Sequence, residues 1–230
     1  MLPKLETPTY LLTIPSTGEE ITFRPFLVKE HKILLTLKEA DENEITRVLR
    51  DLVDNCTFKK IDTKSLTYFD IEYIFVNLRA KSIGEEVDIY FTCSNCTDRF
   101  ETSINLLDAK VSNLDKTNKI KINDQYGVVL KYPELDELIK LSTDSSTEDV
   151  FNLVIKSIQG VYDETNYWDS SDSSEEEISE FIESLTQDQF KKIEEFFTEL
   201  PRVFLDIDKV CEKCGHENNT TISGVMSFFI

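Results

Sequence analysis

Apolar and polar residues alternate near the start of the chain, and this pattern predicts a β-hairpin. Two alternating runs, residues 10–15 and 20–26, flank the glycine-containing turn at residues 16–19. From residue 28 to residue 56 the apolar residues recur at helical spacing instead, interrupted by the acidic residues 41–44. We therefore expect one hairpin followed by two helices.

The same two periodicities predict the later elements. Thr67 or Asp70 is expected to cap a third helix, which runs to Ser82 and ends at Gly84, because glycine often follows the last helical turn. Further strands are expected at 87–91, 100–104, 119–122, 128–132 and 203–208, and further helices at 133–141, 147–158, 175–185 and 187–200. The mixture of hairpins and helices predicts an α+β fold.

Residues 162–177 form a polar, acidic stretch that we interpret as a loop or mobile linker. They lie in a longer segment, residues 157–190, that contains no Lys or Arg. The simpler interpretation is a solvated surface insertion, and the alternative is a segment that docks on a basic partner. Tyr167 and Trp168 favour a partner, because aromatic residues with acidic neighbours can anchor an interface.

Four of the five cysteines form two Cys-x-x-Cys pairs, Cys93 with Cys96 and Cys211 with Cys214. One tight turn of this kind directs two thiolates towards one ion, and two turns supply the four ligands of a closed tetrahedral zinc site. In both halves a Thr lies six residues and an Ile eight residues after the second cysteine, so each pair precedes a similar strand. The pattern predicts one structural zinc ion shared by both pairs.

A redox dithiol, a pair of disulfides and cysteines without a function are the competing interpretations. A redox Cys-x-x-Cys normally opens a helix, whereas neither pair is followed by a helical pattern. His216 could replace one ligand but is interpreted as a surface residue beside the second pair. The fifth cysteine, Cys56, is interpreted as a small buried thiol on a helix.

The distance between the two pairs predicts how the chain is organised. Because 114 residues lie between Cys96 and Cys211, the zinc-ribbon-like module is split by an insertion. We expect an N-terminal hairpin with helices at residues 1–86, a split zinc module at 87–106 and 203–230, and a mainly helical inserted lobe at 107–202 that carries the acidic loop 162–177.

Charge and composition argue against several classes of function. The formal net charge of -19 opposes binding to phosphate backbones and anionic lipid, so no nucleic-acid partner is expected. No apolar run is long enough for a membrane span, and residues 1–6 do not resemble a signal peptide, so a soluble, cytosolic protein is expected. Two histidines and six scattered glycines provide no recognisable catalytic or phosphate-binding motif, so neither an enzyme nor a small-molecule substrate is expected.

The last residues of the chain are strongly apolar. Ile222, Val225, Met226 and Phe229 fall at helical spacing, and Phe228 and Ile230 add apolar surface. The segment is expected either to fold back on its own domain or to insert into a groove of a partner. The candidate partner-binding residues are Tyr167, Trp168, Met226, Phe228, Phe229 and Ile230.

Several of these motifs together resemble a known family. They are residues 16–18 (Ser-Thr-Gly), 23–30 (Phe-Arg-Pro-Phe-Leu-Val-Lys-Glu), 69–73 (Phe-Asp-Ile-Glu-Tyr), 78–85 (Leu-Arg-Ala-Lys-Ser-Ile-Gly-Glu), the two cysteine pairs and Phe228-Phe229. The chain resembles the baseplate hub or hub-assembly proteins of T-even-type contractile-tailed bacteriophages. The resemblance extends over nearly the whole chain and is weakest at residues 162–177.

The resemblance implies a role at the distal end of a phage tail and brings no catalytic residues with it. The implied partners are other baseplate and hub proteins, which assemble in the host cytoplasm before they join the tail tube. Two roles remain open: a structural component of the finished baseplate, and a transient assembly factor or chaperone that is absent from the virion. A nucleic-acid-binding zinc ribbon is a third alternative, which the acidic charge opposes.

Overall fold

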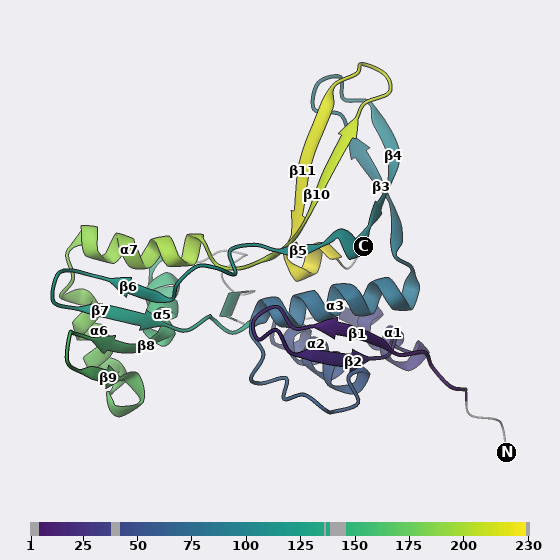
Figure 1. The fold of residues 1–230 in the computed structure, drawn as a ribbon. Coiled ribbons are helices and arrows are strands. Elements are labelled where there is room, and N and C mark those ends of the chain that lie inside the picture. Colours follow the sequence, from purple (N-terminus) through teal and green to yellow (C-terminus); the bar gives the residue numbers. More distant parts are fainter. Residues whose placement is uncertain (1–4, 38–41, 136, 139–145, 229–230) are drawn as a thin grey trace. The chain divides into compact units, whose positions relative to one another are not determined.

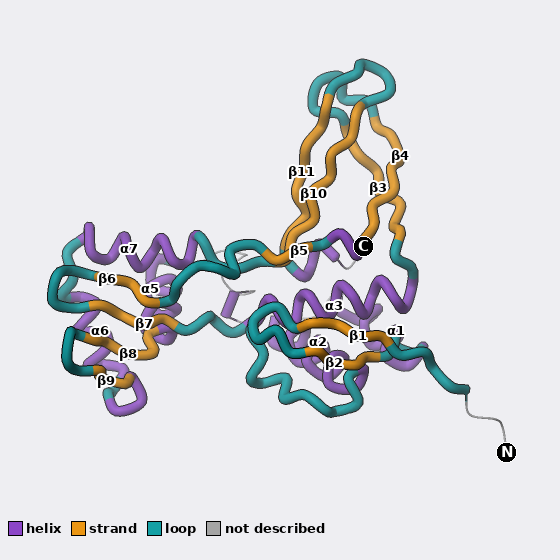
Figure 2. Tube along the Cα trace, viewed as in Figure 1, coloured by secondary structure: helices purple, strands orange, loops and turns teal. Residues whose placement is uncertain are grey.

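The computed structural model describes residues 5–37, 42–135, 137–138 and 146–228 (Figure 1). The chain divides into two compact units, and each is described by itself. Unit 1 comprises residues 1–112 and 201–230, and unit 2 comprises residues 113–200. Helices and small antiparallel sheets occur in both units, so the fold is α+β (Figure 2).

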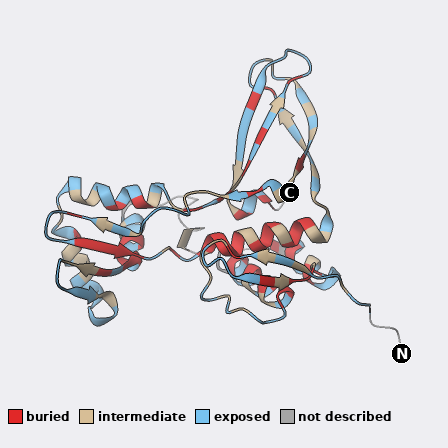
Figure 3. Ribbon diagram, in the orientation of Figure 1, coloured by how far each residue is buried: buried red, intermediate tan, exposed pale blue. Residues whose placement is uncertain are grey.

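Unit 1 begins with the predicted hairpin and three helices. Strands β1 (Tyr10–Thr13) and β2 (Glu20–Phe23) pair antiparallel, and α1 (Val28–Thr36), α2 (Glu42–Cys56) and α3 (Tyr68–Ile83) follow. Helix α3 is buried on almost every side, as Figure 3 shows, because α2 and the C-terminal part of the chain pack on it. These elements confirm the expected hairpin and helices.

Asp70 fixes the start of α3 to the β1–β2 turn. Thr67 is the N-cap, and the Asp70 carboxylate accepts hydrogen bonds from the Thr67 hydroxyl and backbone N–H at 2.6 and 3.1 Å. The same carboxylate accepts bonds from the Ser16 N–H and hydroxyl at 3.0 and 2.6 Å. This fully buried Asp therefore connects two elements far apart in the sequence.

Two longer hairpins complete most of unit 1. Strands β3 (Glu86–Thr92) and β4 (Arg99–Asn105) form one hairpin, and β10 (Val203–Val210) and β11 (Glu217–Ser223) form the other. A 3-10 turn η2 (Leu106–Asp108) leads from β4 into the short β5 (Lys110–Val111), which pairs with the start of β10. Figure 1 shows the two hairpins converging at their turn ends.

The C-terminal apolar residues fall at helical spacing but do not form one helix. Ile222 belongs to β11, Gly224 takes a positive φ of 82°, and only Val225–Phe228 form a short 3-10 helix, η4. Phe228 is fully buried in unit 1, whereas Met226 is 47% exposed. The described part of the segment therefore folds back on its own unit, and Phe229 and Ile230 lie outside the described residues.

Unit 2 combines a four-stranded antiparallel sheet with helices. The strands β6 (Lys119–Lys121), β7 (Gly127–Leu130), β8 (Ile158–Tyr162) and β9 (Tyr167–Asp169) are ordered β6-β7-β8-β9. The helices are α5 (Thr147–Ser157), α6 (Glu175–Glu183) and α7 (Gln187–Thr198). Their shared apolar core consists of Ile122, Val128, Leu130, Val154, Ile155, Ile158, Ile182, Ile193 and Phe196.

Unit 2 differs from the sequence-based expectation at the acidic stretch. Residues 162–177 are not one continuous loop, because they include β9, a 3-10 turn η3 (Ser170–Asp172) and the first turn of α6. Side chains of Asp163, Asp169 and Ser174 accept hydrogen bonds from nearby backbone N–H groups, and these turns give the polar segment a defined backbone conformation.

The helix expected at 133–141 lies largely outside the described residues. Among the described helices, none combines the length and apolar character that crossing a membrane requires.

Candidate metal centre

The two Cys-x-x-Cys pairs lie at the turn ends of the two long hairpins. Cys93 and Cys96 follow β3, and Cys211 and Cys214 follow β10, so each strand delivers its pair to the same end of unit 1. The structure thus brings together four side chains from two segments that are far apart along the chain. We call them the four-cysteine cluster.

Both turns have the same backbone hydrogen bonds. The N–H of Cys93 donates to the carbonyl of Asp98 at 2.9 Å, and the equivalent N–H of Cys211 donates to His216 at 2.8 Å. In return, Thr97 and Gly215 donate their N–H groups to the carbonyls of Cys93 and Cys211. Thr97 and Gly215 both take a positive φ, 58° and 70°, which closes the turn tightly. The two pairs are therefore matching knuckles.

The four sulfur atoms are grouped closely enough to hold one ion. All lie within 4.8 Å of one another, and the Sγ atoms of Cys93 and Cys214, and of Cys96 and Cys211, are 3.7 Å apart. With zinc–sulfur bonds of about 2.3 Å, a tetrahedral site places its sulfur atoms roughly 3.8 Å apart. The close contacts cross from one knuckle to the other, so both knuckles contribute to a single cluster.

Backbone and side-chain donors favour the thiolate form of two of the cysteines. N–H groups of Cys96 and Asn95, with the Asn218 amide, lower the pKa of Cys93 to about 6 against the opposing effect of burial. The His216 N–H likewise lowers the pKa of Cys214. A thiolate is the form of cysteine that binds metal, so these donors prepare the cluster for a cation.

The raised pKa of Cys96 indicates that the cluster requires a positive charge. The Asp98 N–H lowers the pKa of this thiol, but burial and the three neighbouring sulfur atoms outweigh that donor and raise the pKa to about 12. Four sulfur atoms this close cannot all become anionic without a compensating positive charge. The donor set and its electrostatics therefore fit a divalent cation with a preference for thiolate.

Asn218, on β11, holds the two knuckles together. Its side-chain oxygen accepts a hydrogen bond from the Ser94 N–H at 2.9 Å. Its side-chain NH2 group donates a hydrogen bond to the Cys93 sulfur at 3.7 Å. Asn218 is only 3% exposed. Sequence reasoning missed this residue, because an Asn in a polar strand gives no sign that it is buried.

Two further contacts join the knuckles at the surface. Lys213 forms an ion pair with Asp98 at 2.8 Å, and His216 Nε2 lies 3.0 Å from the Ser94 hydroxyl. The imidazole thus contacts the opposite knuckle through Ser94. Cys56 lies apart from the cluster on α2, where burial raises the pKa of its thiol to about 11.

The candidate partner-binding residues occupy different places. Tyr167 and Trp168 are half-exposed on β9 of unit 2, and Met226 is half-exposed on η4 of unit 1. Phe228 is buried and therefore contributes to the interior of unit 1 in this structure. The structure does not gather these residues into one site.

Comparison with known proteins gives one match. No curated protein and no solved structure matches the chain. The model of the T4 bacteriophage base plate protein family matches residues 7–230, which include both hairpins, all four cysteines and unit 2. The chain belongs to the T4 bacteriophage base plate protein family.

Proposed function

We propose that the four-cysteine cluster binds one structural zinc ion. The observation that supports this most strongly is the pair of matching knuckles, whose sulfur atoms already have the spacing of a tetrahedral thiolate site. Four thiolates would fill the coordination sphere and leave no open position for water or substrate. The proposed ion is therefore structural, and the proposed role of the chain is not enzymatic.

The proposed zinc would connect two hairpins that are far apart in the sequence. Strands β3 and β4 come from residues 86–105, and β10 and β11 come from residues 203–223. Structural zinc sites contribute on the order of 10 kcal/mol of apparent binding free energy, which becomes folding free energy. The two hairpins would gain rigidity in this way, because β3, β4 and β11 contain few buried residues.

Membership in the base plate family supports a structural role in a phage tail. We propose more specifically that the chain is a component of the hub region, where it acts through contacts with neighbouring baseplate proteins. A hub-assembly factor that leaves before the virion is complete is the second candidate. The high negative charge of the chain, -19, is the observation that favours a chaperone of this kind.

Quantitative protein analysis of purified virions distinguishes the two roles. A built-in subunit must appear at a constant ratio to the other baseplate proteins, in intact virions and in isolated baseplates. A chain that is abundant in infected cells but absent from both preparations is an assembly factor, and the structural proposal is then wrong.

Metal analysis of the purified chain, prepared without added zinc, tests the ion separately. One zinc per chain is expected, and none or two zinc ions per chain would contradict a shared site.

A further inference from the structure

Unit 2 contains a surface groove that the zinc proposal does not use. The groove has a volume of about 580 Å³ and lies over β8, beside Trp168 of β9 and the start of α6. Its apolar wall includes Ile158, Val161 and Phe181. We call it the Trp168 groove.

Two aromatic rings line the Trp168 groove. Trp168 and Tyr126 have ring centroids 6.3 Å apart at an interplanar angle of 49°, and their side chains remain 47% and 41% exposed. Leaving two large rings exposed beside an apolar wall is unfavourable in water, and such residues are enriched where proteins meet. The faces of the rings also attract cations.

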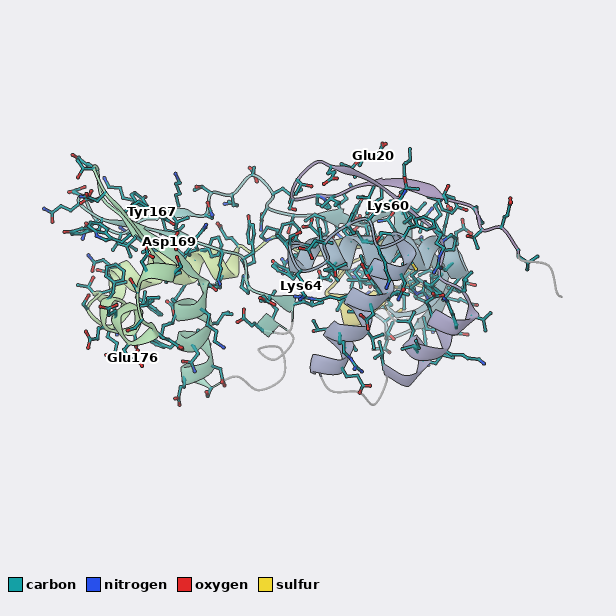
Figure 4. The ribbon with its side chains drawn as sticks, turned by 90° about the horizontal axis from the view of Figure 1, so that it is seen from below. Glu20, Lys60, Lys64, Tyr167, Asp169 and Glu176 are labelled. Carbon is teal, nitrogen blue, oxygen red and sulfur yellow. The ribbon has the colours of Figure 1, made fainter. Side chains whose placement is uncertain are left out.

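Two carboxylates also line the groove. Asp172 of η3 and Glu177 of α6 both line it, and among the described residues of its lining none is basic. Residues 157–190 also supply ten Asp and Glu but no Lys or Arg to neutralise them. Figure 4 labels Tyr167, Asp169 and Glu176, which come from β9 and α6, the elements on either side of η3. The lining of the groove thus combines apolar and aromatic side chains with two negative charges.

We propose that the Trp168 groove binds a positively charged segment of another baseplate protein, with an arginine or lysine that contacts the aromatic rings and the two carboxylates of the lining. An apolar neighbour of that basic residue would pack on the wall formed by Ile158, Val161 and Phe181. Arg fits this combination best, because its guanidinium stacks on aromatic faces and pairs with carboxylates. The inference rests on the proposed structural role and adds the chemistry of one partner.

The chain contains a single tryptophan, so its fluorescence reports on this groove alone. We would titrate the full-length protein with a short acetylated peptide of alternating leucine and arginine. A saturable change in Trp168 emission is expected, and roughly tenfold weaker binding is expected in about 0.5 M salt. A peptide of alternating leucine and glutamate should produce no saturable change.

Variants distinguish the groove from general attraction to an acidic protein. The double substitution Asp172→Asn with Glu177→Gln should weaken binding of the arginine peptide roughly tenfold. The glutamine keeps the side-chain acceptor that caps α6, so the helix should persist. The charge-matched control is Glu148→Gln with Glu195→Gln, two exposed positions outside the groove lining, and it should bind as the unmodified chain does.

Three outcomes would overturn the inference. They are the absence of a saturable change, equal loss of binding in the control variant, and a Trp168 emission that depends on protein concentration alone. The last would show that a second copy of the chain occupies the groove. Virion composition is measured independently, so a chain that is built into virions but does not bind the peptide contradicts the groove and leaves the structural role intact.

Discussion

Asn218 contacts both knuckles: its side-chain oxygen accepts the Ser94 N–H and its NH2 group donates to the Cys93 sulfur in the first knuckle, and the same NH2 group donates to the His216 carbonyl beside the second. Asn218→Ala removes these contacts and leaves the Ser94 N–H without its side-chain acceptor. Because Ser94 is exposed and the net contribution of one hydrogen bond is about 0.5–1.5 kcal/mol, we expect the free energy of unfolding to fall by about 1 kcal/mol. Zinc affinity should fall about tenfold, because groups that orient metal ligands typically contribute that much.

Urea unfolding and competition with a chromophoric zinc chelator measure the two effects of Asn218→Ala. Asn219→Ala is the matched control, since the neighbouring residue is exposed on the same strand. The control should change neither quantity measurably. Equal behaviour of the two variants would show that Asn218 does not support the cluster.

Individual residues of the centre differ in how far the sequence reveals them. The four cysteines can be recognised in the sequence because a zinc site of this kind takes two thiolates from one short turn. That requirement fixes the Cys-x-x-Cys spacing, which is visible in the sequence. Asn218 belongs to a strand whose residues 217–221 are all polar. Without apolar alternation, no pattern shows which side of the strand faces inward.

At the scale of elements, Glu72 connects α3 with the C-terminal turn η4. Its carboxylate is buried and accepts the Val225 N–H at 3.1 Å. Burial raises the pKa of Glu72 from 4.5 to about 7, although the N–H groups of Val225 and Val203 act in the opposite direction. Between these two values the folded state binds more protons than the unfolded state, so this carboxyl makes the folded state less stable as pH rises.

Glu72→Gln should remove this pH dependence, because an amide does not titrate. The stability of the unmodified chain relative to the variant should fall by about 3 kcal/mol between pH of about 4.5 and about 7.5. Urea unfolding across that range measures the difference. The exposed Glu86→Gln on β3 serves as control, and a Glu72→Gln difference that stays constant with pH would contradict the raised pKa.

The β8–β9 pair depends on a glycine. A Cβ on Gly160 would lie 2.5 Å from the Tyr167 ring and 2.7 Å from the Trp168 carbonyl oxygen, whereas the three atoms nearest to a Cβ on Gly127 all belong to the Tyr162 side chain, the closest at 2.2 Å. A side chain can turn away, but a backbone oxygen moves only if β9 moves. Gly160→Ala should therefore destabilise unit 2 by about 1–3 kcal/mol and alter Trp168 fluorescence, with a smaller effect from Gly127→Ala. Similar unfolding curves for both variants would contradict this.

The sequence predicts elements well where one periodicity covers the whole element. The helices α2, α3, α5, α6 and α7 and the two long hairpins lie close to their expected places. Strand β8 was missed because it directly follows α5 and its register is set by pairing with β7, a contact between distant residues. The apolar residues from Ile222 to Phe228 fall at helical spacing although they form the end of a strand and one 3-10 turn, because both arrangements can present the same apolar spacing.

At the scale of the whole molecule, the cluster and the core of unit 2 are separate sources of stability. Among the described residues, the buried core cluster of unit 2 lies between Ile122 and Phe196. Removal of the proposed zinc with a strong chelator should therefore affect unit 1 selectively, because only unit 1 contains the cysteines. We expect amides of β3, β4, β10 and β11 to lose hydrogen-exchange protection roughly a hundredfold.

Amides of β7 and β8 in unit 2 provide the internal control and should keep their protection, and added zinc should restore that of unit 1. Uniform loss of protection across the chain would contradict this division.

The sequence suggested that segments far apart along the chain meet at the cysteines, since the spacing of the two cysteine pairs implies it. That the N-terminal helices share one compact unit with both hairpins could not be predicted, because burial of α3 depends on packing between segments that no local pattern connects.

The pairing of β5 with β10 also bears on how such a chain can change over evolutionary time. Ser112 donates its N–H to the carbonyl of Arg202 at 3.1 Å, so the points where the chain leaves and re-enters unit 1 are direct neighbours. Any segment whose two ends can be brought this close is compatible with the same framework. Residues 113–200 therefore form an insertion whose two ends meet in unit 1, and the framework of unit 1 is expected to tolerate changes in the length of that insertion.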